Sequence, residues 1–413
     1  MDVCSADIKP MLTLEEALEK INSALSPVDD TETIDLKNAK GRVLAHPLYS
    51  ALNLPGDRNA AMDGYAFSSS DKADEQAFTL RLAGTSWAGR PFNGVLERGL
   101  CIRIFTGAVV PESLDSVIMQ EQVSADGDAV HFPAHTRTGQ NIREAGEDVK
   151  KGGLLCAAAK KLTIADMGLL AAAGIADCAV KRRLKIVFFS TGDELAALGQ
   201  ALESGKIYDS NRYLLNGLLA DTCHTVVDGG VIADDKKQLE DTLRQAAADY
   251  DVIITTGGAS VGEADYIKEI LEQCGEITFW KIAVKPGKPL AFGKIGNCHF
   301  FGLPGNPLAV MVTYQQLVAP ALQRLSGTPA AKPLRLTATC TSTLKKSPGR
   351  QEFQCGILTQ DDGGKFFAAS AGPQGSHRLS TVHKANCYII LPIDCKGVEA
   401  GAQVVVEPFS LFI

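Results

Sequence analysis

Between residues 185 and 325, short apolar runs alternate with longer segments of helical periodicity, and this rhythm constrains the fold most. Strands that alternate with helices are typical of a doubly wound α/β domain with a largely parallel sheet. The predicted strands cover residues 185–190, 225–232, 252–255, 278–283, 290–294 and 299–303. The predicted helices cover residues 211–220, 236–248, 263–273 and 307–325. In such a domain, ligands bind beyond the carboxyl ends of the strands.

The loops that follow three of the predicted strands are polar. They are residues 190–194, the pair Asp234 and Asp235, and residues 257–260. In the third loop, Gly257 and Gly258 end an apolar strand, and a helix is expected after Ser260. Backbone N–H groups at a strand–turn–helix junction bind anions. This arrangement favours a phosphorylated or oxyanionic ligand, although two glycines also make an ordinary turn.

The sequence KPGKP carries a second signal for an anion site. Lys285 and Lys288 supply two ammonium groups, which a rigid turn presents to an oxyanion. Pro286 and Pro289 stiffen that turn, and Gly287 permits a tight bend. The alternative interpretation is a solvated loop, because most lysines lie on the surface.

A further Gly/Pro turn, GLPGNP, follows the last predicted strand of this region. It contains Pro304 and opens the last predicted helix at Pro307, a residue favoured in the first turn. Because this turn belongs with the other strand-end loops, both prolines are candidate substrate-binding residues.

The segments on either side of the α/β region are rich in predicted strands. Residues 47–132 show short apolar runs with frequent glycine and proline, and residues after Pro333 alternate apolar and polar positions up to the end. A capping box at Thr13 and Glu16 predicts an N-terminal helix. We therefore predict a multidomain α/β plus β chain, with a central doubly wound α/β domain, β-rich flanking domains and a C-terminal β-barrel.

Composition excludes several classes of function. A chain of 413 residues is expected to form two to four domains, and its net charge of −7 disfavours a nucleic-acid-binding surface. No apolar run is long enough for a transmembrane helix, and the N-terminus lacks the pattern of a signal peptide, so a cytoplasmic protein is expected. The 11 cysteines are scattered without a CxxC pair, which indicates reduced thiols and argues against zinc.

Motifs along nearly the whole chain resemble those of the molybdopterin molybdenumtransferase family, which includes the C-terminal domain of gephyrin. In order, they are NAAMDGYA, RIFTGAVVP, MQEQ, GQNIREAGED, STGDEL, IYDSN, TTGGASVGEADY, KPGKPLAFG and GLPGNP. The resemblance implies insertion of molybdate into adenylylated molybdopterin, with release of AMP and assistance from Mg²⁺. It also implies a cytoplasmic homodimer, with molybdopterin adenylyltransferase and downstream molybdoenzyme chaperones as partners, and no nucleic acid or membrane.

The resemblance further implies four domains in each subunit. The expected boundaries are 1–48 with 149–183 for an elongated helical domain, 49–148 for a β-rich domain, 184–331 for a molybdopterin-binding α/β domain, and 332–413 for a C-terminal β-barrel.

Most candidate site residues carry over from the family motifs at matching positions, and Gly257, Gly258, Ser260, Pro304 and Pro307 come from the strand-end loops described above. The candidate catalytic residues are Asp63, Thr106, Asp234, Asp265 and Lys281. The candidate substrate-binding residues are Gly257, Gly258, Ser260, Lys285, Lys288, Pro304, Pro307, Arg350 and Ser376. The candidate ligands of Mg²⁺ are Asp148, Glu194 and Asp265.

Two of these carboxylates also have a purely structural interpretation. An aspartate before a helix, such as Asp234, is typically an N-cap, and one in the first turn, such as Asp265, stabilises the helix dipole. Three alternative functions stay open: a molybdopterin adenylyltransferase, a non-catalytic scaffold of the same fold, and a binding module for free molybdate. The KPGKP loop and the extra β-rich domains favour the transferase over the first, and the complete set of charged site residues argues against the second.

Overall fold

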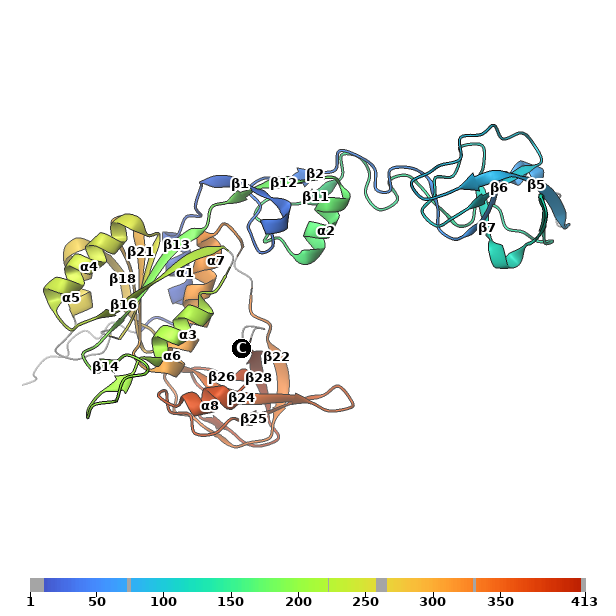
Figure 1. The fold of residues 1–413 in the computed structure, drawn as a ribbon. Helices are drawn as coiled ribbons and strands as arrows, with labels where there is room; N and C mark the ends of the chain where they lie inside the picture. Colours follow the sequence, from blue (N-terminus) through green and yellow to red (C-terminus); the bar gives the residue numbers. More distant parts are fainter. Residues whose placement is uncertain (1–10, 73–75, 222, 258–265, 330–331, 410–413) are drawn as a thin grey trace, which may run out of the picture. The chain divides into compact units, whose positions relative to one another are not determined.

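The computed structural model describes residues 11–72, 76–221, 223–257, 266–329 and 332–409 (Figure 1). The chain divides into two compact units. The first, here called the main unit, comprises Met1–Glu32, Gly41–Val43 and Val180–Ile413. The second, here called the insert unit, comprises Thr33–Lys40 and Leu44–Ala179. None of the described helices is both long enough and apolar enough to cross a membrane.

The main unit contains a six-stranded sheet. Its strands are β13 (Leu184–Thr191), β16 (His224–Ile232), β17 (Val252–Thr256), β18 (Glu276–Lys281), β20 (Pro289–Ile295) and β21 (Cys298–Leu303), in the order β16-β13-β17-β21-β20-β18. The first four strands in this order are parallel, whereas β20 pairs antiparallel with both of its neighbours. The predicted doubly wound α/β domain is therefore confirmed, with an antiparallel hairpin toward one edge.

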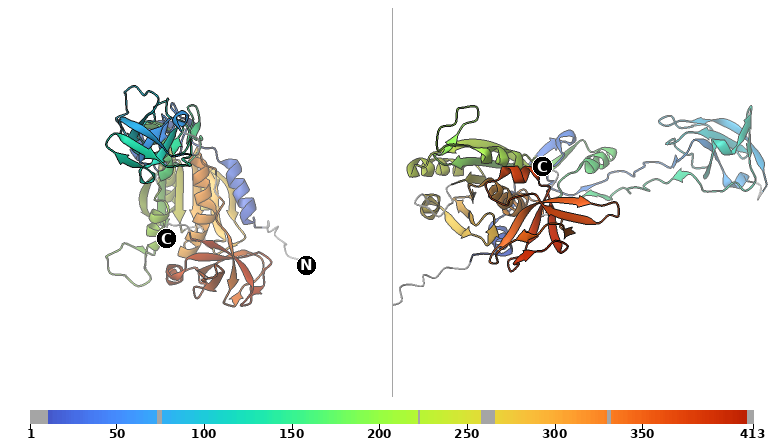
Figure 2. Two further views of the ribbon diagram at one scale, coloured as in Figure 1. Left: turned by 90° about the vertical axis from the view of Figure 1, so that its right-hand side faces the viewer. Right: turned by 90° about the horizontal axis from the view of Figure 1, so that it is seen from below.

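Helices cover both faces of this sheet (Figure 1 and Figure 2). They are α1 (Leu14–Ala24), α3 (Ser210–Leu218), α4 (Lys236–Asp249), α5 (Tyr266–Cys274), α6 (Pro307–Thr313) and α7 (Ala319–Leu325). Successive residues of a strand point to opposite faces, so β13 feeds two cores. Ile186 and Phe188 pack in the core that α1, α3, α6 and α7 share. Val187 and Phe189 pack in the core formed with α4 and α5.

The structure shows which residues cap α3 and α4, and how the last predicted helix of this region is built. Asp209 caps α3 by accepting from Arg212 N at 3.1 Å, and Asp235 caps α4 by accepting from Gln238 N at 2.7 Å. The single helix expected over 307–325 contains a π-helical turn, Tyr314–Val318, between α6 and α7. Pro320 has no N–H for the regular bond to the fourth residue before it, which accounts for an irregular turn there.

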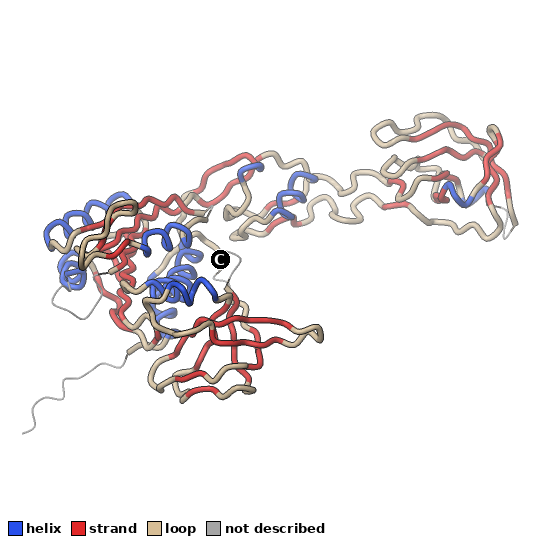
Figure 3. Tube along the Cα trace, turned by 60° about the horizontal axis from the view of Figure 1, so that its bottom comes forward, coloured by secondary structure: helices blue, strands red, loops and turns tan. Residues whose placement is uncertain are grey.

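The C-terminal part of the main unit is a closed barrel, as predicted (Figure 3). Its strands are β22 (Leu336–Cys340), β24 (Gln351–Gln360), β25 (Phe366–Ser370), β26 (Cys387–Leu391) and β28 (Gln403–Pro408). They follow the order β24-β25-β22-β28-β26, and β26 returns to pair with β24. The barrel also carries α8 (Leu379–Lys384), β23 (Leu344–Lys345) and β27 (Gly397–Val398).

A short strand of the α/β domain, β19 (Val284–Lys285), joins the barrel at β24 in parallel. The register places Lys285 opposite Glu352. Backbone hydrogen bonding therefore continues from the lysine-rich loop into the barrel.

The insert unit has a six-stranded sheet of its own, in the order β7-β4-β6-β5-β9-β8. These strands are β4 (Gly64–Phe67), β5 (Phe78–Ser86), β6 (Leu100–Ile104), β7 (Ser116–Met119), β8 (Ser124–Asp126) and β9 (Ala129–Phe132). Shorter elements are β2 (Leu48–Tyr49), β3 (Asn59–Ala60), β10 (Ile142–Arg143), β11 (Leu154–Cys156) and α2 (Ile164–Ala172). The chain enters and leaves this unit through β1 (Thr31–Asp35) and β12 (Asp177–Lys181). The β-rich flanking region is confirmed, and the division into four domains stays a prediction.

Candidate active site

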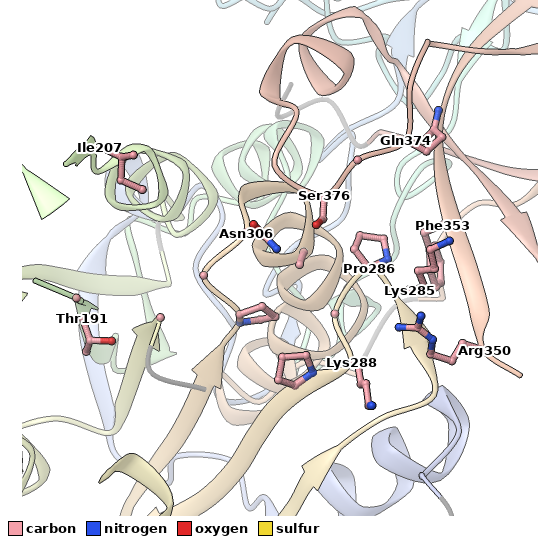
Figure 4. Close-up of a pocket in the computed structure, with 18 of the residues that line it drawn as sticks. Thr191, Ile207, Lys285, Pro286, Lys288, Asn306, Arg350, Phe353, Gln374 and Ser376 are labelled. Carbon is pink, nitrogen blue, oxygen red and sulfur yellow. The ribbon is translucent and has the colours of Figure 1, made fainter. Parts of the chain in front are cut away.

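A cavity of about 890 Å³ opens in the main unit, where the strand-end loops of the α/β domain face the barrel (Figure 4). Its α/β-domain lining is Thr191, Gly192, Glu194, Ile207, Asp234, Gly257, Lys285, Pro286, Gly287, Lys288, Pro289, Pro304, Gly305, Asn306 and Ala309. Its barrel lining is Arg350, Glu352, Phe353, Gln374, Gly375 and Ser376. Eight of the predicted site residues share this cavity: Glu194, Asp234, Gly257, Lys285, Lys288, Pro304, Arg350 and Ser376.

The lysine-rich loop is a tight turn held against helix α6. Ile282 N donates to Lys288 O at 3.1 Å, which closes the loop. Gly287 has a φ of 117°, and a Cβ built there would lie 2.6 Å from Cγ2 of Thr313 in α6. Only glycine fits this position without displacing the loop. The turn presents Lys285 and Lys288 to the cavity together with Arg350 of the barrel (Figure 4).

Two barrel segments complete the cationic end of the cavity. Ser376 O accepts from Leu308 N at 3.0 Å, so the loop that carries Ser376 is fixed to the start of α6. Gln374 holds the same loop to strand β24, because its side chain accepts from Cys355 N at 2.7 Å and donates to Cys355 O at 3.0 Å. These contacts hold Ser376 in the lining of the same cavity as Lys285 and Lys288.

The other end of the cavity is formed by the strand-end loops. Gly257 has a φ of 89°, and a Cβ there would lie 2.4 Å from the carbonyl oxygen of Thr191, so the loops after β13 and β17 approach closely. Asn211 ties the end of β17 to the loop after β21 by donating to Thr256 Oγ1 at 3.2 Å and to Gly305 O at 2.7 Å. Glu194 and Asp234 are exposed in this region. Asp235 is the helix cap, so Asp234 has no capping role.

The cavity therefore has two chemical poles. Lys285, Lys288 and Arg350 supply positive charge beside the barrel, and Glu194 and Asp234 supply negative charge at the strand ends. A cationic pole binds oxyanions through charge-assisted hydrogen bonds. Carboxylates beside a phosphate ligand suit a divalent cation.

Other predicted residues of the main unit lie outside this lining or outside the described residues. Pro307 is the first residue of α6 and directly follows Asn306 in the lining. Lys281 ends β18, opposite Pro289, with its side chain exposed. Gly258, Ser260 and Asp265 lie outside the described residues.

Three predicted residues belong to the insert unit. Asp63 accepts from Thr106 N at 2.8 Å and from Thr106 Oγ1 at 2.6 Å. The hydrogen bond from the Thr106 side chain, with that from its backbone, lowers the pKa of Asp63. Asp148 is exposed, and its backbone N–H donates to Leu54 O at 2.9 Å. The structure thus joins Asp63 to Thr106, and the roles of all three residues stay predictions.

Sequence reasoning missed several residues that line the cavity, and Glu352 is the most consequential. Its side chain is 5% exposed, and its Oε1 lies 3.0 Å from Lys285 Nζ. No strand pattern marks it, because the predicted Arg350, two residues earlier, lies just before β24 and not on it. Asn306, Gln374 and Ile207 were also missed as site residues, although Asn306 lies within the motif GLPGNP and Ile207 within IYDSN.

Comparison with known proteins identifies the family. Models described as MoeA N-terminal region (domain I and II), probable molybdopterin binding domain and MoeA C-terminal region (domain IV) match residues 12–174, 187–324 and 337–409. A molybdopterin molybdenumtransferase of Haemophilus influenzae is 43% identical over 97% of this chain and 99% of its own length. The chain belongs to the molybdopterin molybdenumtransferase family.

Two further proteins are similar to this chain over nearly its whole length. One from Nostoc is 33% identical over 96% of this chain and 94% of that protein. The crystal structure of the molybdopterin biosynthesis moeA protein of Pyrococcus horikoshii superposes with a TM-score of 0.84, at 28% identity, over 97% of this chain and 100% of that one. The resemblance seen in the motifs is confirmed, and the chain is a transferase of molybdenum cofactor biosynthesis.

Proposed function

We propose that this enzyme inserts molybdate into adenylylated molybdopterin and releases AMP. The observation that carries the proposal is the cationic pole of the cavity, where Lys285, Lys288 and Arg350 meet Ser376 from two domains. Molybdate is a tetrahedral dianion, and a cavity lined by ammonium, guanidinium and hydroxyl donors suits it. The strand-end loops then receive the phosphate-bearing part of the substrate.

The backbone at the strand ends supports this second assignment. Gly257 and Gly305 line the cavity and carry no side chain, which favours close approach of a phosphate group to the backbone there. Gly258 and Ser260 extend the same turn in the sequence, and Pro304 and Pro307 flank the neighbouring one. The adenylyl phosphate would lie near these loops, and the dithiolene sulfurs would lie near the lysines.

The proposed reaction has a simple balance. An oxygen of water or of molybdate attacks the phosphorus of the phosphoanhydride, the bond from that phosphorus to the bridging oxygen breaks, and AMP leaves. The two thiols then displace one oxygen from molybdenum; this oxygen leaves as water with the thiol protons, or stays on the phosphate when molybdate is the attacking group. Lys285, Lys288 and Arg350 hold the oxyanion and neutralise charge, and the rigid loop limits its orientations. The catalytic roles of Asp63, Thr106, Asp234, Asp265 and Lys281 are part of the same proposal and rest on the family resemblance.

The carboxylates present fit Mg²⁺. Among the described residues no cluster of three metal-ligating side chains occurs, but Glu194 and Asp234 both line the cavity. Mg²⁺ is commonly bound by one or two carboxylates together with substrate phosphates and water, so two suffice. Glu194 and Asp234 would hold it, with Asp148 and Asp265 as further predicted ligands. When bound, Mg²⁺ supplies positive charge to the phosphate oxygens.

We extend the proposal to the cellular setting of the enzyme. It would act in the cytoplasm as a homodimer, receive the adenylylated pterin from molybdopterin adenylyltransferase, and pass the finished cofactor to molybdoenzyme chaperones. These statements rest on the family resemblance and on the chemistry of the substrate, which another enzyme must adenylylate first.

Incubation of the purified protein with adenylylated molybdopterin, Mg²⁺ and molybdate tests the proposal. We expect AMP release that depends on molybdate, measured by chromatography. Release of pyrophosphate from ATP and molybdopterin would instead identify an adenylyltransferase. Binding of the adenylylated pterin without AMP release would indicate a scaffold, and binding of molybdate alone would indicate a module for the free anion.

A further inference from the structure

A buried carboxylate, Glu352, lies at the cationic pole of the cavity. A carboxylate repels a dianion, and the repulsion grows where water is excluded. Its position in an oxyanion pocket therefore requires a compensating function. The contacts of Glu352 point to one.

Glu352 is fixed on the barrel side and reaches toward the lysine loop. Gln354, which is 3% exposed, donates from Nε2 to Glu352 Oε1 at 3.2 Å and to Lys345 O at 3.0 Å. Glu352 Oε1 also lies 3.0 Å from Lys285 Nζ. The carboxylate is thus held by a buried amide, and its partner across the cavity wall is the ammonium group of Lys285.

The backbone fixes the same pair. β19 and β24 are hydrogen-bonded in parallel, with Lys285 opposite Glu352, and Gln351 N donates to Ala283 O at 2.8 Å. Lys285 remains 45% exposed toward the cavity. An ammonium group has three N–H donors, so a bond to Glu352 uses one and directs the other two.

We propose that Glu352 is a positioning residue, whose carboxylate holds the Lys285 ammonium in the direction from which it donates to molybdate. This proposal rests on the proposed molybdate insertion. Residues that hydrogen-bond to metal ligands act in a similar way, because they orient the ligands without binding the metal themselves. Glu352 touches Lys285 and acts on the substrate through it.

Glu352→Gln separates positioning from simple charge. The glutamine keeps the shape but holds Lys285 more weakly, so we expect kcat for molybdate-dependent AMP release to fall roughly tenfold, as for outer partners of metal ligands. The KM for molybdate should not rise, because a negative charge near a dianion has been removed. An unchanged kcat with a lower KM would overturn the proposal and indicate repulsion alone.

Glu352→Asp is a second variant, which changes the length of the side chain instead of its charge. The charge is kept, but the side chain is one methylene shorter and no longer reaches Lys285 in the same geometry. The positioning role predicts a reduced kcat here as well. Wild-type kcat in Glu352→Asp, together with a reduced kcat in Glu352→Gln, would show that charge and not position matters.

A double-mutant cycle tests whether Glu352 acts through Lys285. In the Lys285→Met background, Glu352→Gln should lower kcat by less than twofold further. An equal further tenfold loss would mean that Glu352 acts independently of Lys285, and the proposal would be wrong.

Glu407→Gln is the matched control. Glu407 is also a buried barrel carboxylate, 7% exposed, which accepts from Gln316 Nε2 at 2.5 Å and lies 3.3 Å from Arg335 Nε, but it does not line the cavity. If it lowers kcat as much as Glu352→Gln at similar melting temperature, the effect reflects barrel packing and the proposal fails. A wild-type enzyme without molybdate-dependent AMP release would refute the proposed function and the positioning role with it. Active wild type with fully active Glu352 variants would refute only the positioning role.

Discussion

Although Gly287→Ala adds only one methyl group, we expect it to displace the lysine-rich loop. The φ of 117° at this position is one that side chains rarely adopt, and the new Cβ would lie 2.6 Å from Thr313 Cγ2. Carbon atoms pack at about 3.5–4.0 Å, so roughly 1 Å of movement is needed to relieve the contact. Thr313 cannot yield easily, because it is 1% exposed and its hydroxyl donates to Ala309 O at 2.7 Å. The loop must move instead.

The expected cost has two parts. Holding alanine in the strained backbone conformation costs about 1–3 kcal/mol of stability, which lowers the melting temperature by a few degrees. Displacing Lys285 and Lys288 by about 1 Å is expected to lower molybdate-dependent AMP release on the order of a hundredfold. Turnover is measured by AMP chromatography, and stability by thermal melting followed by circular dichroism.

Gly296→Ala is the matched control for this substitution. Gly296 lies between β20 and β21, has a φ of 58°, and has no atom within 4 Å of a built Cβ. It therefore carries backbone strain without the contact with α6, and we expect a similar or smaller loss of stability with normal turnover. Wild-type turnover in Gly287→Ala, or an equal loss of turnover in both variants, would refute the reasoning.

Further predictions concern the lysine-rich loop, an ion pair of the main unit and the proposed magnesium ion. Lys288→Met should raise the KM for molybdate roughly tenfold through loss of a charge-assisted hydrogen bond, while the KM for the adenylylated pterin changes less, as steady-state kinetics would show. Arg182→Met should cost about 1.5–3 kcal/mol in urea unfolding, because Arg182 donates to Asp251 at 2.7 Å and 2.8 Å, and its removal leaves that half-buried carboxylate with only the hydrogen bond from Lys185 N. Burial raises the pKa of Asp251, but hydrogen bonds from Arg182 and Lys185 N outweigh it and lower the pKa below its ordinary value of 3.8. This stabilisation is complete above pH 3.8 and is lost as the pH falls through the lowered pKa, so the difference in unfolding free energy between wild type and Arg182→Met should shrink over that range. Removal of divalent cations with EDTA should abolish AMP release and added Mg²⁺ should restore it, whereas full activity in EDTA would exclude the magnesium assignment.

The architecture of the α/β domain was predictable because its signals are local. Consecutive apolar residues such as Ile186 and Val187 point to opposite faces of the sheet, so an unbroken apolar run predicts a strand with a core on each side. The KPGKP loop was also predictable from local sequence, because proline fixes the backbone φ angle and glycine permits a tight turn. The lysines it carries do line the cavity.

What escaped prediction depends on pairing between distant segments. Asp235 and not Asp234 caps α4. The two possibilities differ by one residue in the start of the helix, and helix propensities do not predict a helix end that accurately. The pairing of Lys285 with Glu352 depends on the register of β19 against β24, across more than sixty positions of chain. No local pattern encodes such a register, so a carboxylate in an anion site was overlooked.

The strand that β19 adds to the barrel also limits how the two domains can be recombined. A slip of one residue in a strand pairing turns every side chain to the opposite face. A chimaera that takes residues 332–413 from a relative must therefore preserve the alignment of Val284 with Gln351 and of Lys285 with Glu352. Exchange of the barrel as an independent module would separate the lysine from its partner even if both halves folded well.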